Sequence, residues 1–197
     1  GYPLFTWTDG GQVCQKQMSL GVEKDIIQVI RSKDEECMDI LKNSLKDGGC
    51  AGIILNTVAR AQDFAQKLSE CFPECEMIQM HSQFIISDRA EIEREILKRA
   101  GKNSTPEQRN KLIIVGTQVL EQSLDIDFDV MITDLCPMDL LLQRIGREHR
   151  HKGRKRPLCL QKAKCYVLTE TRVVYDKWLL QRTADKLPEY FCLPDDI

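Results

Sequence analysis

Two short runs of uninterrupted apolar residues constrain the fold of this chain more than any other feature. Residues 52–55 read Gly-Ile-Ile-Leu, and residues 112–115 read Leu-Ile-Ile-Val. A strand with one face in water alternates apolar and polar residues, whereas a strand that is covered on both faces is apolar throughout. The sequence therefore predicts a sheet whose central strands are buried on both faces.

Segments with a helical spacing of apolar residues separate the strands. Cys37, Ile40, Leu41 and Leu45 mark one helix, two more fall within residues 61–72 and 92–100, and a fourth is expected over Val173–Leu187. Alternating strands and helices favour a parallel sheet. We therefore predict an α/β fold, a mostly parallel β-sheet with helices on both faces, as one domain over residues 1–197. The predicted strands are Leu4–Thr8, Ile26–Ile30, Ala51–Asn56, Glu76–Met80, Leu112–Gly116, Val130–Thr133 and Cys165–Leu168.

Polar residues stand at the carboxyl ends of three predicted strands. Asn56 and Thr57 end one strand, His81 and Ser82 follow the second, and Thr117 follows the third. Ligands of parallel sheets gather at this edge, so we expect these residues to share one rim. Thr57 opens a helix whose free amides could bind phosphate, and it is also a plain helix cap. A lone histidine after a strand, such as His81, is more often a local hydrogen-bonding group than a catalyst.

The segment Gln143–His151 reads Gln-Arg-Ile-Gly-Arg-Glu-His-Arg-His. Guanidinium groups three positions apart lie on one face of a helix, so Arg147 and Arg150 are predicted to converge on one object. Their planar, permanently charged forks suit phosphate oxygens. The net charge is only −2, yet residues 144–156 hold seven basic residues and one acid, Glu148. By itself such a stretch is more typical of a solvated basic face.

The segment Gly116–Asp127 is the second candidate for nucleotide chemistry. Thr117 can offer a hydroxyl and a backbone amide to a phosphate. Asp125, eight residues further on, is placed to bind a ribose hydroxyl, as carboxylates do at other nucleotide sites. The alternative is that Asp125 and Asp127 simply bound a turn before Val130.

Two other segments resemble nucleotide motifs only in part. Gly101–Thr105 is similar to a phosphate loop, but Ile96 occupies the position of its first glycine. Asp34–Cys37 is similar to an acidic magnesium box, yet it follows Arg31–Lys33 instead of a buried strand, and Ser32 with Glu35 is expected to form a capping box. The sequence thus predicts neither a phosphate loop nor magnesium carboxylates.

The remaining composition narrows the class of protein. Nine cysteines are an odd number at irregular spacing, which favours reduced thiols over disulfides or a metal site. No apolar stretch approaches about 18 residues and no signal peptide opens the chain, so we expect a soluble, cytoplasmic protein without a membrane partner. A start at Gly1 and an ending of Leu193–Asp196 suggest a fragment of a longer protein.

Together, Gly116–Asp127 and Gln143–His151 resemble motifs V and VI of a superfamily 2 helicase. The string Glu121–Asp127, with His149 and His151, is similar to the helicase-nuclease of type I CRISPR systems. The resemblance extends to Asn56-Thr57-Val58, Ala61-Gln62, His81-Ser82, Tyr175 and Arg182-Thr183. It implies that this chain is the second RecA-like domain only, without the nuclease, first RecA-like and carboxyl-terminal domains.

The resemblance also implies a function. The chain would be the second motor domain of an ATP-dependent single-stranded-DNA translocase in antiviral defence. ATP with Mg would bind between this domain and the first RecA-like domain, so the isolated chain should be inactive. Other partners would be single-stranded DNA, the nuclease domain of the same protein and the crRNA-guided surveillance complex. Because the two halves of the ATP site lie on different domains, hydrolysis and domain closure would be coupled.

Single residues receive roles from the same resemblance. Arg147 and Arg150 would act as arginine fingers on the γ-phosphate, and Gln143 would contact phosphate or the attacking water. Arg144 would support the motif within the nucleotide-binding set, and Asp125 would touch the ribose. The DNA track would be lined by Thr57, His81, Ser82 and Thr117.

Two alternatives stay open. The chain could belong to another superfamily 2 helicase, of the DNA-repair type. It could also be a non-catalytic module that holds nucleic acid with residues 144–156. The module predicts that Arg147→Ala and Lys155→Ala weaken DNA binding alike, whereas the helicase predicts that Arg147→Ala abolishes ATP hydrolysis while DNA binding survives.

Overall fold

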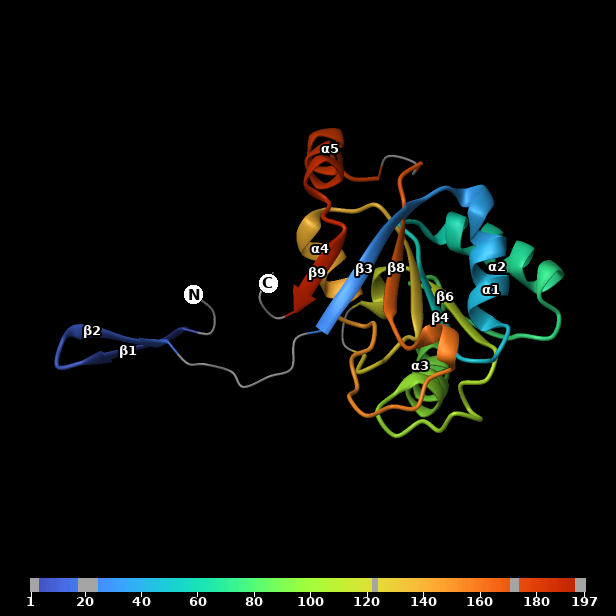
Figure 1. Ribbon diagram of the computed structural model, residues 1–197, viewed down its shortest axis with the longest axis horizontal. Coiled ribbons are helices and arrows are strands. Elements are labelled where there is room, and N and C mark those ends of the chain that lie inside the picture. Colours follow the sequence, from blue (N-terminus) through green and yellow to red (C-terminus); the bar gives the residue numbers. More distant parts are fainter. Residues whose placement is uncertain (1–3, 18–24, 122–123, 171–173, 194–197) are drawn as a thin grey trace.

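A computed structural model describes residues 4–17, 25–121, 124–170 and 174–193. Its centre is a seven-stranded sheet of order β5-β6-β4-β7-β8-β3-β9, in which only β9 runs antiparallel to its neighbour (Figure 1). This confirms the predicted α/β class. The strands are β3 (Asp25–Ser32), β4 (Cys50–Ile54), β5 (Glu76–Met80), β6 (Leu112–Gly116), β7 (Val130–Asp134), β8 (Ala163–Leu168) and β9 (Tyr190–Leu193).

Two separate apolar cores explain the uninterrupted apolar runs. In β4, Ile53 packs with helices α1 (Cys37–Leu45) and α2 (Val58–Cys71), while the next residue, Ile54, packs into the core of the opposite face. Successive side chains of a strand point to opposite faces, so a strand between two cores must be apolar at every position. The second core contains buried residues of α3 (Ile86–Ala100), α4 (Met138–Ile145) and α5 (Lys177–Lys186).

The amino-terminal segment departs from the prediction. Leu4–Thr8 is a strand, but it belongs to a separate antiparallel hairpin of β1 (Leu4–Asp9) and β2 (Gln12–Gln17) instead of the main sheet. Gly10 and Gly11 form its turn with φ values of 53° and 86°, a left-handed pair that glycine adopts without strain. The hairpin stands away from the sheet in Figure 1. Its apolar residues cover no core, and Leu4, Phe5 and Val13 are exposed.

Other element boundaries also differ. β9 was not predicted, α5 begins only at Lys177, and Val173 and residues 194–196 lie outside the described residues. The capping box expected from Ser32 and Glu35 is wrong, because β3 runs through Ser32. Instead, the backbone amide of Lys33 donates to the Glu36 carboxylate at 2.7 Å.

Gly52 positions the segment that carries the predicted aspartates. A Cβ at this glycine would lie 2.4 Å from the ring of Phe128, which is fully buried against β4. The ring is thus held in a space that any larger residue would close. Phe128 in turn fixes the path of residues 125–129 as they enter β7.

Candidate functional site

The predicted polar rim forms at the carboxyl ends of β4, β5 and β6. The amide of Thr117 donates to the Met80 carbonyl at 3.2 Å, and the amide of Leu55 donates to the Gly116 carbonyl at 2.8 Å. The side chain of Gln118 reaches the Asn56 carbonyl at 3.1 Å. The three loops are therefore neighbours, as expected for residues that follow parallel strands.

Residues on this rim differ in what they leave available. The hydroxyl of Thr57 accepts from the Arg60 amide at 3.2 Å, which confirms its role as a helix cap. The backbone amide of Thr117 is already bonded to Met80, contrary to the prediction that it can be offered to a phosphate, and the residue is only 2% exposed. Ser82 is exposed.

His81 behaves as a local hydrogen-bonding group. It is only 4% exposed, and its ring stacks on Phe84 with centroids 4.3 Å apart. Its Nδ1 accepts from the Gln83 amide at 3.3 Å, and burial lowers the pKa of the imidazole. A neutral ring enclosed in this way organises the loop around Ser82 and offers little surface to a ligand.

The arginine segment follows a different path from the predicted helix. α4 ends at Ile145, so Arg147 and Arg150 do not lie on a helical face. The backbone of Arg147 accepts from the Phe128 amide at 2.8 Å, and the amide of His149 donates to the Phe128 carbonyl at 3.0 Å. His149 adopts a left-handed φ of 50°, which turns the chain before Arg150. Tertiary hydrogen bonds to Phe128 have replaced the next helical turn.

Arg147, Arg150 and Asp125 nevertheless meet at this turn. Arg150 Nε lies 2.8 Å from the Asp125 carboxylate, and this contact lowers the pKa of Asp125. Arg147 donates to the Glu121 carbonyl at 2.8 Å, while its buried Nε has no hydrogen-bond partner among the described residues. Burial and the nearby Arg150 both lower the pKa of Arg147. Two neighbouring cations, of which Arg150 is exposed, fit an anion such as a phosphate.

Arg144 is enclosed instead of open. Its side chain is fully buried, and its Nε lies 2.5 Å from the Glu121 carboxylate. Its Nη1 donates to Asn56 Oδ1 at 3.1 Å and to Thr133 Oγ1 at 2.9 Å. The side chain thus cannot reach a ligand in this conformation, which corrects its place in the nucleotide-binding set and agrees with the supporting role. It joins Glu121, beside Arg147, to Asn56 on the rim.

The rest of the basic segment is largely neutralised inside the protein. Asp127 is fully buried and lies 2.5 Å from Arg154 Nε and 2.9 Å from Arg156 Nη2. Asp129 pairs with Arg156 and with Arg109, the latter at 2.9 Å. Asp127 is therefore an internal ion-pair partner and does more than bound a turn, whereas Asp125 pairs with Arg150 at the surface. Gln143 lies on α4 with its side chain exposed.

Sequence reasoning missed the carboxylates that enclose the arginines. Glu121 and Asp129 were not identified as partners, although an acid close in space to every buried arginine is a general requirement. The excess of basic residues in 144–156 was the available signal, because a run of that charge cannot be buried without acids from elsewhere.

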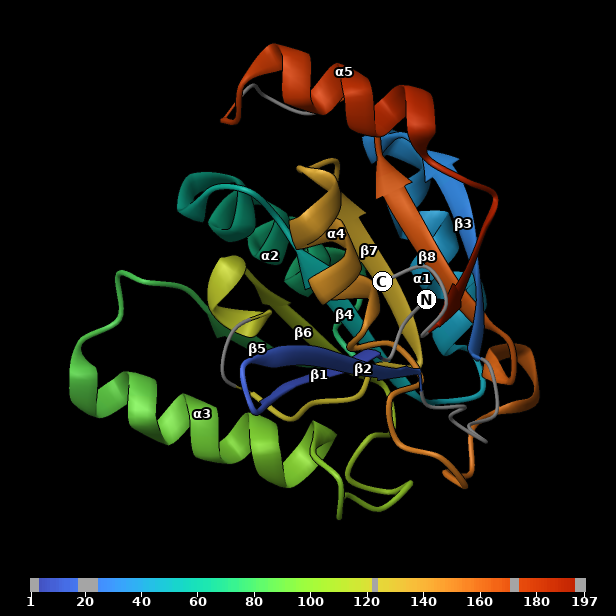
Figure 2. The same ribbon diagram turned by 90° about the vertical axis from the view of Figure 1, so that its left-hand side faces the viewer.

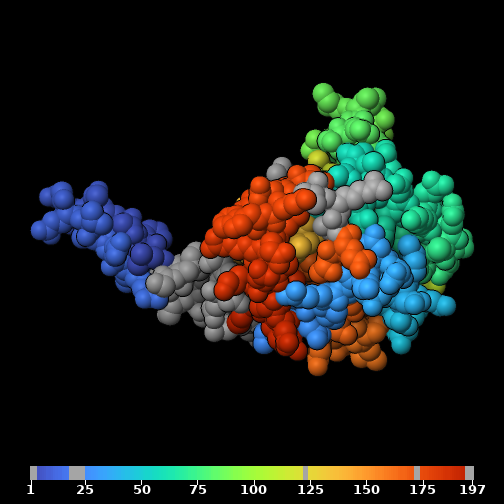
Figure 3. Space-filling view, turned by 90° about the horizontal axis from the view of Figure 1, so that it is seen from above, coloured from blue at the N-terminus to red at the C-terminus, as the bar shows by residue number. Residues whose placement is uncertain are grey.

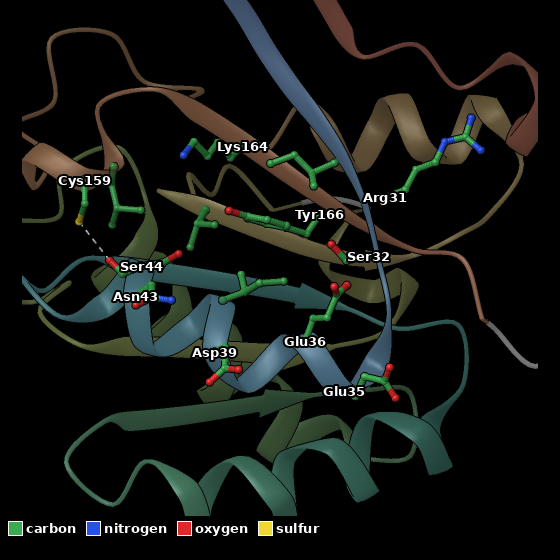
Figure 4. A pocket seen from close by; sticks show the side chains of 14 residues that line it. Arg31, Ser32, Glu35, Glu36, Asp39, Asn43, Ser44, Cys159, Lys164 and Tyr166 are labelled. Atoms are coloured by element: carbon green, nitrogen blue, oxygen red, sulfur yellow. Dashed lines mark hydrogen bonds between the residues drawn. The ribbon is translucent and has the colours of Figure 1, made fainter.

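A pocket between α1 and the β3–β8 side of the sheet is lined by none of the residues predicted to bind nucleotide or DNA (Figure 4). Glu36, Asp39, Lys164 and Tyr166 are among its lining side chains, and burial raises the pKa of Tyr166. Within the described ranges, no group of three or more His, Cys, Asp or Glu side chains is arranged to hold a metal ion. Nor is any described helix long and apolar enough to cross a membrane.

One known protein family matches the part of the chain that contains the rim and the arginine segment. Residues 47–153 match the family model described as CRISPR-associated nuclease/helicase Cas3, C-terminal. That range includes every residue predicted above to bind nucleotide or DNA.

Three known proteins are similar to the chain. The CRISPR-associated nuclease/helicase Cas3 of Streptococcus thermophilus is 46% identical over all of this chain and 22% of its own length. A crystal structure of T. fusca Cas3-AMPPNP covers all of this chain and 26% of its own with a TM-score of 0.87 and 30% identity. The C-terminal domain of the DEAD-box protein Dbp5 covers 83% of this chain and 87% of its own, with a TM-score of 0.50 at 19% identity, and so shares the RecA-like fold alone. The chain thus spans about a quarter of the two Cas3 relatives.

Proposed function

The chain belongs to the family of the CRISPR-associated nuclease/helicase Cas3, as its second RecA-like domain, and from this premise we propose that it is one half of an ATP-driven motor on single-stranded DNA. The other half would be the first RecA-like domain of the same protein. In this proposal Arg147 and Arg150 supply the positive charge that phosphoryl transfer requires.

The meeting of Arg147, Arg150 and Asp125 at one turn carries the proposal. Half-buried Arg147 lies beside exposed Arg150, so the pair has the charge for a phosphate. Bound ATP with Mg would supply the phosphoryl group, and one similar structure is that of T. fusca Cas3-AMPPNP. Asp125, exposed beside Arg150, would bind the ribose hydroxyl, and exposed Gln143 would contact phosphate or water.

The polar rim supports the second part of the proposal, a track for the DNA backbone. Thr57 caps the start of α2, Ser82 is exposed, and Thr117 directly follows β6. Hydroxyl and helix-terminus contacts of this kind bind phosphates without reading sequence. His81 would hold the loop of Ser82 from within. Movement along DNA should therefore be nearly independent of sequence.

The whole protein's partners form the outer part of the proposal. By family, the motor would work with a nuclease domain and with a crRNA-guided surveillance complex in the cytoplasm, in defence against viruses. A purely basic binding module is less favoured, because buried acids neutralise the charges of Arg144, Arg154 and Arg156. A DNA-repair helicase of the same superfamily would lack nuclease activity.

ATP hydrolysis by two proteins tests the proposal. We expect a full-length protein that carries this sequence to hydrolyse ATP faster when single-stranded DNA is added, because both halves of the nucleotide site are then present. The 197-residue chain alone should hydrolyse none above background. Robust hydrolysis by the chain alone would contradict the proposal, since the chain would then hold a complete nucleotide site.

A further inference from the structure

Helix α5 lies beside the polar rim but takes no part in the function proposed so far. Figure 2 shows it beyond the carboxyl ends of β7 and β8, and in Figure 3 it forms an uncovered ridge. It is anchored to the sheet: Leu180 is buried in the apolar core, and Arg31 donates to the Ala184 carbonyl at 2.6 Å. The helix therefore presents its outer face in a fixed orientation.

An exposed tryptophan dominates that outer face. Trp178 is 63% exposed, although a side chain of this size is normally among the more buried in a protein. The guanidinium carbon of Arg182 lies 5.2 Å from the centre of its ring. Trp178 and Arg182 also line a shallow pocket with Pro137 and Met138, which lie where β7 passes into α4.

Positive charge continues from the ring along one stripe of the helix. Trp178, Arg182 and Lys186 are spaced four residues apart, so they follow one another at intervals of about 6 Å, and all three line the same pocket. Asp139 is the one acid among the described residues that line it. A flat aromatic ring followed by two cations suits a ligand that has both a base and phosphates.

The stripe is also connected to the proposed track. The side-chain amide of Gln118, the residue after Thr117, donates to the Tyr175 hydroxyl at 3.0 Å and to the Asn56 backbone carbonyl at 3.1 Å. Tyr175 lies three residues before Trp178. The segment that leads into α5 therefore contacts the rim next to Thr117 and Asn56.

We propose that Trp178 is a stacking site for a base of single-stranded DNA, with Arg182 and Lys186 meeting the phosphates that follow. This inference rests on the proposed DNA track and adds a contact to bases, which the rim itself does not offer. Stacking on an aromatic face is tolerant of sequence, because every base has a π face. It would give the strand a fixed resting position without making movement depend on sequence.

The tryptophan itself provides the test. The chain has two tryptophans, so the Trp7→Phe variant, changed in the remote hairpin, leaves Trp178 as the sole reporter. Oligo-dT and an abasic strand of the same length are each titrated at low salt, and binding is followed by anisotropy of a labelled strand and by tryptophan fluorescence. We expect oligo-dT to quench Trp178 and the abasic strand to leave it unchanged.

Substitutions make the test quantitative. Trp178→Ala should weaken oligo-dT binding by about tenfold and abasic binding hardly at all, and Trp178→Phe should retain most of the affinity. Tyr190→Ala, which removes another exposed aromatic ring on β9, is the matched control and should have no effect.

The outcomes separate the two proposals. Binding of oligo-dT without quenching, and with equal affinity in Trp178→Ala, would overturn the stacking site and leave the track standing. No binding of either strand by anisotropy would overturn both. A loss of stability in a full-length Trp178→Ala protein without DNA would also overturn the stacking site, because it would mark the ring as part of an internal domain contact.

Discussion

Two sets of arginines within one short segment have opposite environments. Arg144, Arg154 and Arg156 have side chains that are 0%, 7% and 6% exposed, and each faces a buried carboxylate. Arg150 is 43% exposed, and half-buried Arg147 donates to the Glu121 carbonyl instead of a buried carboxylate. The difference shows that charge in a sequence does not assign function: the acids that meet each guanidinium decide whether it holds the fold or remains available to a ligand.

The largest effect expected on stability comes from removing an enclosed arginine. Arg144→Ala leaves Glu121 buried without its partner and should lower the free energy of unfolding by about 3–5 kcal/mol. Denaturant unfolding of the 197-residue chain measures this. The double variant Arg144→Met, Glu121→Leu should recover much of the loss, since it removes both charges. If Arg144→Ala lowers the free energy of unfolding by less than about 1 kcal/mol, the distinction between the two sets of arginines is wrong.

A smaller, pH-dependent effect should come from Glu148, the enclosed acid within the basic segment. It accepts from the Lys164 amide at 2.5 Å, has no ion pair with any described residue, and burial raises the pKa of its carboxyl well above the usual value. The folded state therefore holds the proton more tightly than the unfolded state. This contribution to stability is complete below about pH 4.3 and is lost as the pH rises through the folded pKa.

Glu148→Gln keeps the shape and cannot ionise. Its free energy of unfolding should consequently fall less steeply than that of the native chain between about pH 5 and pH 8. A series of denaturant titrations across this range provides the comparison, and Asp134, whose pKa burial also raises, is unchanged in both proteins. Parallel curves for the two proteins would show that Glu148 does not titrate in this way.

The sequence predicted the parts of the fold that depend on local pattern. Continuous apolar runs identified β4 and β6, and polar residues after strands identified the rim, because strand period and parallel topology follow from spacing alone. It did not predict β9 or the separate pairing of Leu4–Asp9, since both depend on which strand is available as a partner. An exposed edge carries little pattern of its own.

The candidate site was predicted by residue but not by geometry. The spacing of Arg147 and Arg150 suggested one helical face, yet hydrogen bonds to Phe128 and the left-handed turn at His149 bring them together by another route. The enclosing acids Glu121 and Asp129 are 23 and 27 residues away from the arginines that they meet. Contacts at such separations are set by the tertiary fold, so a local pattern could not reveal them.

The most direct test of the role proposed for Arg147 and Arg150 is a paired measurement on Arg147→Ala in a full-length protein that carries this sequence. We predict that the rate of DNA-stimulated ATP hydrolysis falls by about 10³-fold or more, whereas DNA binding largely survives. The free energy of unfolding should change by at most about 1.5 kcal/mol, the contribution of one hydrogen bond. Lys155→Ala, an exposed control in the same segment, should leave hydrolysis unchanged. Hydrolysis that persists in Arg147→Ala, or an equal loss of DNA binding in both variants, would contradict the account.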